Sequence, residues 1–143
     1  MTQIEAIQNE IVNQFQSASD WESRYKMIIQ IGRELPDLDE SQRIDENLVK
    51  GCQSRVWMSA RLEGDRVIFE ADSDASIVKG LVALLLKTYS GHTPDEILNH
   101  PPHFIEKLGL NANLSQTRAS GLASMVKQIK FYALAFKAIT SRT

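Results

Sequence analysis

The stretch VWMSARLEGDRVIFEA, residues 56–71, alternates apolar and polar side chains on either side of a central Glu-Gly-Asp-Arg sequence. Alternation with a period of two places successive side chains on opposite faces of a strand, so each half predicts a half-buried strand. Gly64 and Asp65 are residue types that favour a two-residue turn. The stretch therefore predicts an antiparallel hairpin. Its apolar face would carry Val56, Met58, Ala60, Leu62, Val67, Phe69 and Ala71.

A turn at Gly64 and Asp65 fixes the register of this hairpin, because residues equally distant from the turn then face each other. The same register places Glu63 opposite Arg66, which pairs opposite charges. Two strands alone are only marginally stable, so residues 48–49 are expected to add a third. The apolar pairs predicted by the register are Leu62 with Val67, Ala60 with Phe69, and Met58 with Ala71.

Two amphipathic helices are predicted before the hairpin, because apolar residues recur there at spacings of three and four. Ser19 to Glu22 reads as a capping box that begins the second helix at Ser19, and Leu35-Pro36 marks its end. Residues 37–47 are polar and predict a surface loop. The two apolar stripes are Ile4, Ile7, Ile11 and Phe15, then Trp21, Tyr25, Ile28 and Ile29.

Helices are also predicted after the hairpin. Asp72-Ser73-Asp74 offers an N-cap to an apolar helix that would end near Gly91. Thr93 to Glu96 is a second capping box, with proline at the first helical position, and Pro101-Pro102 stops the short helix that follows. Ser115 caps a long final helix. The apolar positions of the first and last of these helices are Ile77, Leu81, Leu84 and Leu85, and Leu122, Met125, Ile129, Tyr132, Phe136 and Ile139. The fold class is thus α+β, a small antiparallel sheet covered by helices.

The composition is that of an ordinary globular protein, and its 143 residues fit one domain over 1–143. A net charge of −2 gives no general electrostatic reason to bind nucleic acid or an anionic membrane. The N-terminus lacks the basic and apolar regions of an export signal. The longest apolar run, residues 80–86, is far shorter than the ~20 residues of a spanning helix. We therefore expect a cytoplasmic protein.

Cys52 is the only cysteine, and it lies in the polar sequence Gly51-Cys52-Gln53-Ser54 just before the hairpin. A lone cysteine cannot close an intramolecular disulfide or supply a multi-thiolate metal site, so no metal is expected. It can be a small buried apolar residue or a reactive thiol carried on a loop. The preceding glycine and the polar residues that follow Cys52 favour a loop. A buried apolar residue and a reactive thiol both remain possible interpretations.

The hairpin register also predicts the surroundings of Cys52. The end of the second strand, and with it the start of the Ile77 helix, should return beside the Cys52 loop. A helix N-terminus and the cations Lys50, Arg55 and Lys79 would lower the thiol pKa, whereas the carboxylates of the Asp72–Asp74 segment would raise it. The direction of the net shift does not follow from the sequence.

A cysteine hydrolase would need a histidine base beside Cys52. The three histidines, His92, His100 and His103, all follow the Ile77 helix and are expected far from the thiol. His100 and His103 have no cysteine or carboxylate at a spacing that would complete a metal site. The first observation counts against a cysteine hydrolase, and the second counts against a histidine metal site.

The charged candidates each have a structural and a functional interpretation. Asp72 and Asp74 are expected as strand-end and cap residues rather than as a catalytic acid and base. Arg118 is in the first turn of the final helix, where the helix dipole disfavours a cation. It is expected to pair with Asp72 or Asp74, and the alternative is an anchor on a binding surface or a charge beside the thiol.

Three motifs make the sequence similar to one family. They are Gly51-Cys52-Gln53-Ser54-Arg55-Val56-Trp57, Asp72-Ser73-Asp74 followed by Ile77-Val78-Lys79-Gly80, and Thr117-Arg118-Ala119-Ser120-Gly121-Leu122. In this order and at these separations they resemble the SufE sulfur-acceptor family, which includes its paralogue CsdE. The likeness extends from Trp21 to Leu122, and the family shares its fold with IscU-type scaffolds. The Gln53-Ser54 pair resembles SufE, and the Gly109-Leu110 region leans toward CsdE.

The resemblance implies that Cys52 accepts persulfide sulfur from a cysteine desulfurase of the SufS or CsdA type and passes it on for iron-sulfur cluster assembly. The chain itself would need no cofactor, because pyridoxal phosphate belongs to the desulfurase. It would act as an acceptor and activator rather than as a free-standing enzyme. Asp72, Asp74, Lys79 and Arg118 are expected to support the site or the partner. The alternatives are a cysteine hydrolase and an IscU-like scaffold or interaction module.

Persulfide transfer needs one accessible thiol and no second cysteine that could release the sulfur by forming a disulfide. A persulfide is easily oxidised or reduced, so we expect Cys52 to be sheltered in the free protein. Gly51 would allow the loop to open, and Val56 and Trp57 would provide the cover.

Overall fold

The computed structural model describes residues 1–141 and confirms an α+β fold built around one hairpin. β1 (Val56–Glu63) and β2 (Arg66–Ser73) pair antiparallel, and the turn between them holds Gly64 at a φ of 64°. A positive φ suits glycine because it has no Cβ. All the predicted pairs are observed: Leu62 with Val67, Ala60 with Phe69, Met58 with Ala71, and Glu63 with Arg66.

Residues 48–49 reach the hairpin but do not form a full third strand. Leu48 makes a single antiparallel bridge to Trp57, and the Val49 N–H donates to the Val56 carbonyl at 2.8 Å. The bridge cannot extend further because the chain turns away at Lys50. Two short 3-10 turns, η1 (Glu40–Gln42) and η2 (Asp45–Asn47), precede this contact in the predicted loop.

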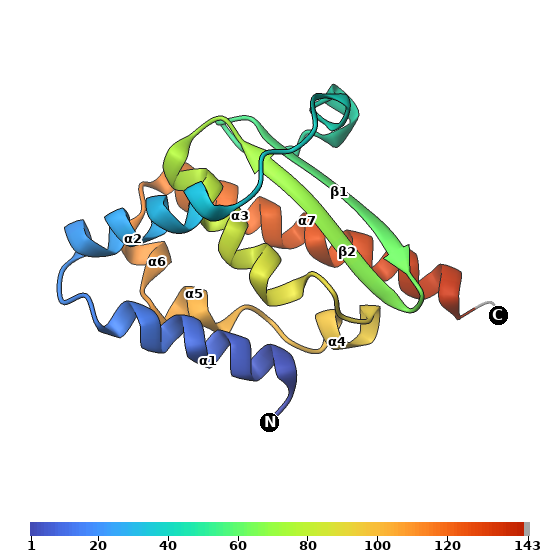
Figure 1. Ribbon diagram of the computed structural model, residues 1–143, viewed down its shortest axis with the longest axis horizontal. Coiled ribbons are helices and arrows are strands. Elements are labelled where there is room, and N and C mark those ends of the chain that lie inside the picture. The colour runs from blue at the N-terminus through green and yellow to red at the C-terminus, as the bar shows by residue number, and fades with distance from the viewer. Residues whose placement is uncertain (142–143) are drawn as a thin grey trace.

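The central helix α3 (Ser76–Tyr89) is buried on almost every side, and β2 and the neighbouring helices pack around it (Figure 1). Its predicted N-cap is wrong. Ala75 occupies that position without a capping side chain, because the Asp74 carboxylate accepts the Arg55 N–H at 3.2 Å instead. Gly91 follows the helix with a φ of 88°. The predicted apolar positions are all buried: Ile77, Leu81, Leu84 and Leu85.

α1 (Gln3–Gln16) and α2 (Trp21–Glu34) pack on α3 through their predicted apolar stripes. The cap of α2 is Asp20, which accepts the Ser23 N–H at 2.7 Å, so the prediction of Ser19 was wrong by one residue. The helix ends before Leu35-Pro36, as predicted. Ile4, Ile11, Phe15 and Ile28 are buried, and Ile7, Trp21, Tyr25 and Ile29 are partly buried.

α4 (Pro94–Leu98) has the predicted capping box at Thr93, and α7 (Gln116–Thr140) has the predicted cap at Ser115. Two short helices, α5 (His103–Lys107) and α6 (Leu110–Asn113), lie between them and were not predicted. Leu122, Met125 and Ile129 of α7 are buried, and Tyr132 and Phe136 are partly buried.

The last predicted apolar position of α7 is wrong, because the Ile139 side chain is 57% exposed. Figure 1 shows the reason: α7 passes behind the hairpin and continues toward the C-terminus beyond the strands. The Tyr132 hydroxyl donates to the Met58 carbonyl at 3.3 Å, which marks where the helix crosses β1. No helix within residues 1–141 combines the length and apolar character needed to cross a membrane.

Candidate functional site

The loop that carries Cys52 lies against the first turns of α7. Gly51 has a φ of 93°, which disfavours any residue with a Cβ. A Cβ at this position would also lie 2.4 Å from the Ser124 Oγ, closer than atoms can approach. The turn of the loop therefore favours glycine at position 51, and a larger residue there would also force the Ser124 side chain to move.

Cys52 is half-buried at the tip of this loop, and it is a free thiol. Its Sγ lies 3.5 Å from the Gly121 carbonyl, to which the thiol donates a weak hydrogen bond. Burial raises the pKa of the Cys52 thiol, because the thiolate would lose hydration. The structure thus decides the direction that the sequence left open, and the free protein keeps Cys52 as a thiol.

A cavity of about 20 Å³ adjoins the Cys52 side chain. This volume is enough for about one water-sized atom and too small for an organic substrate. The apolar part of its wall comes from Val78 in the first turn of α3 and Met125 of α7, so the predicted return of the Ile77 helix is confirmed. The full lining is Cys52, Gln53, Ser54, Val78, Thr117, Arg118, Gly121 and Met125.

The predicted cover of Val56 and Trp57 is wrong, because neither residue lines this cavity. Val56 is fully buried in the core beneath the hairpin, and Trp57 points to the other face of β1. There its ring lies 5.3 Å from the guanidinium carbon of Arg43. Alternation along β1 places Val56 and Trp57 on opposite faces of the hairpin, and both are buried there rather than at the loop tip.

Uncharged polar side chains surround the mouth of the site. Gln53 is exposed, and Ser54 is half-buried against the cavity. A second, more open hollow beside the loop is lined by Gly51, Gln53, Gln116, Thr117 and Ser120. The approach to Cys52 therefore offers amide and hydroxyl groups but no acidic side chain.

Arg118 is the one charged residue among those that line the Cys52 cavity. The predicted pairing with Asp72 or Asp74 is wrong, and Arg118 forms no ion pair with any residue in the described range 1–141. Its exposed guanidinium stands at the cavity without a carboxylate partner. Both functional interpretations therefore remain, an anchor on a binding surface and a charge beside the thiol.

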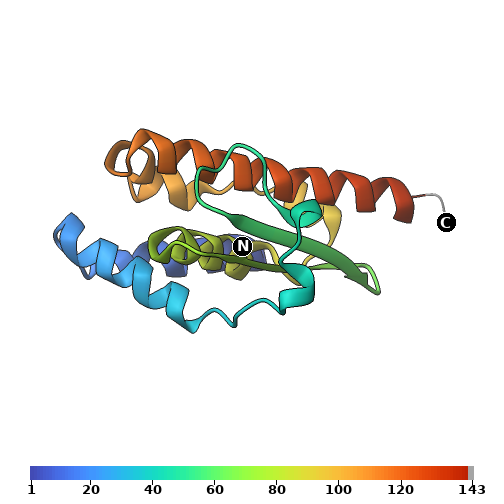
Figure 2. The ribbon, with the colours of Figure 1, turned by 90° about the horizontal axis from the view of Figure 1, so that it is seen from above.

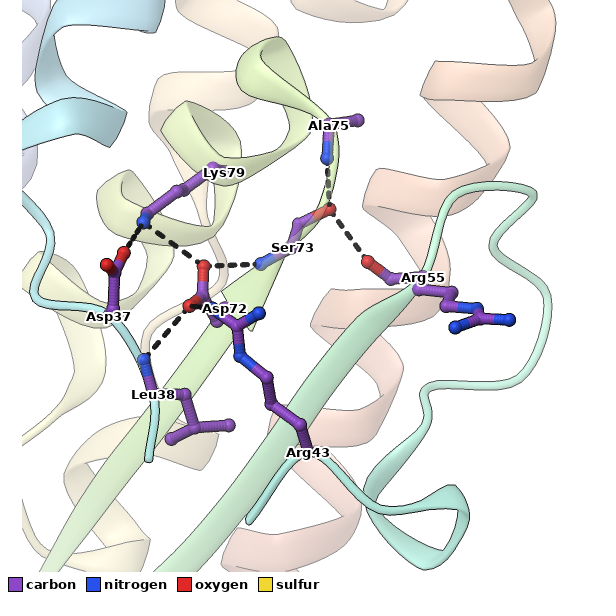
Figure 3. A network of polar contacts seen from close by, with 8 residues as sticks. All are labelled: Asp37, Leu38, Arg43, Arg55, Asp72, Ser73, Ala75 and Lys79. Atoms are coloured by element: carbon purple, nitrogen blue, oxygen red, sulfur yellow. Dashed lines mark hydrogen bonds and ion pairs between the residues drawn. The ribbon is translucent and has the colours of Figure 1, made fainter. Parts of the chain in front are cut away.

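Asp72 is fully buried and organises a separate polar network, drawn in Figure 3. Its carboxylate accepts the N–H groups of Leu38 at 2.9 Å and Ser73 at 2.8 Å, and it pairs with Arg43 at 2.6 Å and Lys79 at 3.3 Å. Burial would raise the pKa of Asp72, but these donors together outweigh it and hold the pKa below its usual range.

This network shows that Asp72 and Lys79 support the fold rather than the thiol. Lys79 also pairs with Asp37 at 2.5 Å, and that hydrogen bond is the largest cause of its raised pKa. Neither Asp72 nor Lys79 lines the Cys52 cavity. Asp74 lies closer to the site, because its bond to the Arg55 N–H holds the C-terminal end of the cysteine loop against the start of α3.

The three histidines lie away from Cys52, and none lines its cavity. His92 is buried beside β2, 3.5 Å from Glu96. His100 and His103 line a different cavity, between α1 and the segment around α5. In the described part of the chain, no group of three His, Cys, Asp or Glu residues is placed to hold a metal ion.

Sequence reasoning missed Gly121, Val78 and Met125 as parts of the site. Gly121 carried a usable signal, because a glycine inside a helix costs about 1 kcal/mol relative to alanine and often marks a close approach. Here the approaching group is the Cys52 side chain, whose Sγ would lie 3.5 Å from a Cβ at Gly121. Val78 and Met125 resembled ordinary core residues.

Fold and site together define a class of small α+β protein with one half-sheltered cysteine on a glycine-preceded loop. Comparison with known proteins places the chain in a family. The family model of SufE, the Fe-S metabolism associated domain, matches residues 9–133. The chain belongs to the SufE family.

Curated relatives match over most of their length. An uncharacterized SufE-like protein of Rhizobium etli is 46% identical over 127 residues, which cover 85% of this chain and 86% of the relative. An uncharacterized SufE-like protein of Synechocystis is 41% identical, over 89% of this chain and 80% of the relative. A hypothetical protein from Thermus thermophilus, solved in solution, has the same fold. It superimposes with a TM-score of 0.75 over 92% of this chain and 96% of its own, at 21% identity.

Proposed function

We propose that this protein is a sulfur acceptor that takes sulfane sulfur from a cysteine desulfurase onto Cys52 and passes it on for iron-sulfur cluster assembly. One observation carries the proposal: the only cysteine of the chain is half-sheltered on a loop, beside a cavity with room for one further atom. Membership of a family associated with Fe-S metabolism supports it.

The chemistry is thiol exchange. The Cys52 thiolate attacks the terminal sulfur of a persulfide on the donor cysteine, the S–S bond of the donor breaks, and the donor leaves as a thiolate. Cys52 then carries the persulfide, and no external oxidant or reductant is consumed. The pyridoxal phosphate that generates the donor persulfide belongs to the desulfurase. Removal of its sulfur frees the desulfurase for another turnover, so the acceptor also stimulates it.

The residues around Cys52 fit each stage of this exchange. The 20 Å³ cavity has room for the added sulfur beside Val78 and Met125. Arg118 provides a positive charge at the cavity, which would favour the anion of the Cys52 persulfide over its neutral form. Gly51 permits the loop to change its backbone conformation when a donor approaches.

The alternatives receive no comparable support. A hydrolase needs a base, and no histidine or carboxylate lines the Cys52 cavity. A scaffold that used Cys52 as a metal ligand would have to recruit its other ligands from outside the described residues of this chain. Sulfur acceptance uses the site as it stands.

The test is mass spectrometry of the protein after incubation with cysteine and a purified desulfurase, with SufS-type and CsdA-type enzymes tried in turn. We expect a mass increase of one sulfur atom that a thiol reductant removes. The control is Cys52→Ser, which should gain no sulfur while its circular dichroism spectrum stays unchanged. Absence of the adduct with every desulfurase, while the wild type still reacts with inorganic polysulfide, would contradict the proposal.

A further inference from the structure

The outer face of α7 is a row of residues that are exposed, except for Ser124, which is half-buried beside the cysteine loop. We define this outer face as Ser120, Ser124, Lys127, Phe131, Leu134 and Ala138, which recur at spacings of three and four and so share one side of the helix. Figure 2 shows α7 as the outermost layer on its side of the molecule, with open space beyond its C-terminal half. Apart from Ser124, the side chains of this face are exposed.

Two large apolar side chains stand on the outer face. Phe131 is 62% exposed and Leu134 is 56% exposed, although the opposite side of the same helix buries its apolar residues completely. A single exposed apolar side chain needs no explanation, but two neighbours at i and i+3 form a continuous patch. Such a patch marks an interaction surface.

The charge of α7 indicates which partner this surface fits. Arg118, Lys127, Lys130 and Lys137 are the only charged residues of the helix, although the whole chain has more acidic than basic residues. Lys137 pairs with Asp95 of α4 at 2.9 Å, whereas Lys127 and Lys130 form no ion pair within residues 1–141. A second copy of α7 would bring like charges together, and an acidic surface would neutralise them.

The outer face is continuous with the Cys52 site. Ser124 is the residue that Gly51 packs against, and Ser120 lines the open hollow beside the cysteine loop. At a rise of about 1.5 Å per residue, Phe131 and Leu134 lie roughly 10 and 15 Å along the helix from Ser124. A partner that covers about 800 Å² of this protein would span both the loop and the patch.

We propose that the outer face of α7 is the docking surface for the sulfur donor, which contributes an acidic surface with apolar residues at its centre. The proposal rests on the proposed function and adds where the donor binds. Phe131 and Leu134 would supply the buried centre of the contact, and Lys127 and Lys130 would steer the acidic partner into place.

The test compares variants for binding to the desulfurase that loads the wild type, or to each candidate desulfurase in turn if none loads it. Surface plasmon resonance on the Cys52→Ser background measures affinity and association rate without sulfur transfer. We expect Phe131→Ser with Leu134→Ser to weaken binding at least about tenfold. We expect Lys127→Glu with Lys130→Glu to lower the association rate and to reduce its dependence on salt.

Two control variants change similar residues on other elements. Ile44→Ser removes an apolar side chain that is 43% exposed before η2, and Lys26→Glu reverses an exposed charge on α2. Both should bind like the wild type. In the Cys52 background, the α7 variants should show a raised KM for sulfur transfer with an unchanged kcat, and they should react with inorganic polysulfide at the rate of the wild type.

Three results would overturn the docking surface. The first is that both α7 double variants bind the desulfurase with the affinity of the wild type. The second is that the control variants lose as much affinity as the α7 variants do. The third is a concentration-dependent dimer in sedimentation that Phe131→Ser with Leu134→Ser abolishes, which would assign the face to a second copy. Because affinity is measured without sulfur transfer, none of these results depends on the persulfide experiment. Failure of the proposed function would instead appear as a wild-type protein that gains no sulfur.

Discussion

At the scale of single residues, Cys52 is held in a state that protects it rather than one that activates it. Its thiol donates to the Gly121 carbonyl, and burial raises its pKa. Only the thiolate is nucleophilic, so both effects slow its reactions at neutral pH. A sulfur carrier of the proposed kind would gain from this arrangement, because the thiol would react mainly after a donor has opened the loop.

The first prediction at this scale concerns alkylation of Cys52 by iodoacetamide, a small neutral reagent. In the folded protein the rate should rise with pH around a midpoint above that of the same thiol in the urea-unfolded chain, since burial disfavours the folded thiolate. At neutral pH the folded protein should therefore react more slowly than the unfolded one.

A desulfurase whose own reactive cysteine has been replaced should accelerate this alkylation. By binding the protein with its loop open, it would raise the fraction of molecules in which Cys52 is exposed to the reagent. The accompanying control is bovine albumin at equal concentration, which should have no effect. If Cys52 reacts at the same rate and with the same pH midpoint in the folded protein and in the unfolded chain, the thiol is not sheltered in solution.

At the scale of elements, the crossing of α2 and α3 depends on two glycines. A Cβ at Gly80 would lie 2.1 Å from the Ile28 carbonyl oxygen, and one at Gly32 would lie 2.7 Å from the Gly80 nitrogen. The backbones of the two helices therefore touch without side chains between them. This contact fixes where α3 lies, and α3 supplies Val78 to the Cys52 cavity.

We predict that Gly80→Ala destabilises the protein even though alanine favours a helix by about 1 kcal/mol. The clash with backbone atoms should dominate and lower the free energy of unfolding in urea by about 2 kcal/mol or more. Gly121→Ala is the matched control, because its Cβ would make only an ordinary 3.5 Å contact with Cys52. It should leave the stability unchanged or raise it. Equal stability of Gly80→Ala and wild type would show that α2 and α3 can separate at no cost.

The elements also show what a sequence can and cannot predict. The hairpin was predictable to the residue, because the period of two and the Gly64-Asp65 turn determine its register locally. The capping box at Thr93 and the cap at Ser115 are local as well. α5 and α6 were missed because helices of four or five residues are too short to show a periodicity.

The candidate site divides in the same way. Gly51 and Cys52 were evident from their immediate neighbours, whereas the cavity wall comes from residues distant in sequence. The cap assigned to Asp74 failed because the Arg55 N–H, across the end of the hairpin, competes for the same carboxylate. Of the two partners expected for Arg118, Asp72 pairs with Arg43 and Lys79 instead, and Asp74 accepts the Arg55 N–H. Each of these outcomes depends on tertiary contacts that no local pattern contains.

At the scale of the whole molecule, Asp72 joins three parts of the chain that are otherwise separate. Its carboxylate, at the end of β2, bonds to Leu38 and Arg43 of the loop after α2 and to Lys79 of α3 (Figure 3). Most residues of the predicted surface loop, 37–47, are exposed, but Leu38 is buried and so ties this loop to the core. A single buried charge thus holds the loop, the hairpin and the central helix together.

The last prediction is that Asp72→Asn destabilises the protein by about 2 kcal/mol at neutral pH, since bonds to a charged acceptor are replaced by weaker ones. Asp65→Asn, in the exposed turn of the hairpin, is the control and should leave the stability unchanged. Both are measured by urea unfolding between pH 7 and pH 3.

The sign of the pH dependence follows from the lowered pKa of Asp72. A carboxyl whose pKa is lower in the folded than in the unfolded state stabilises the fold above its unfolded pKa, about 3.9, and that stabilisation disappears as the pH falls through the folded value. The wild type should therefore lose stability more steeply than Asp72→Asn on acidification. The difference between their free energies of unfolding should become smaller below about pH 4. If the difference in unfolding free energy between wild type and Asp72→Asn stays constant down to pH 3, the charge of Asp72 contributes nothing. Its hydrogen bonds alone would then hold the three segments together.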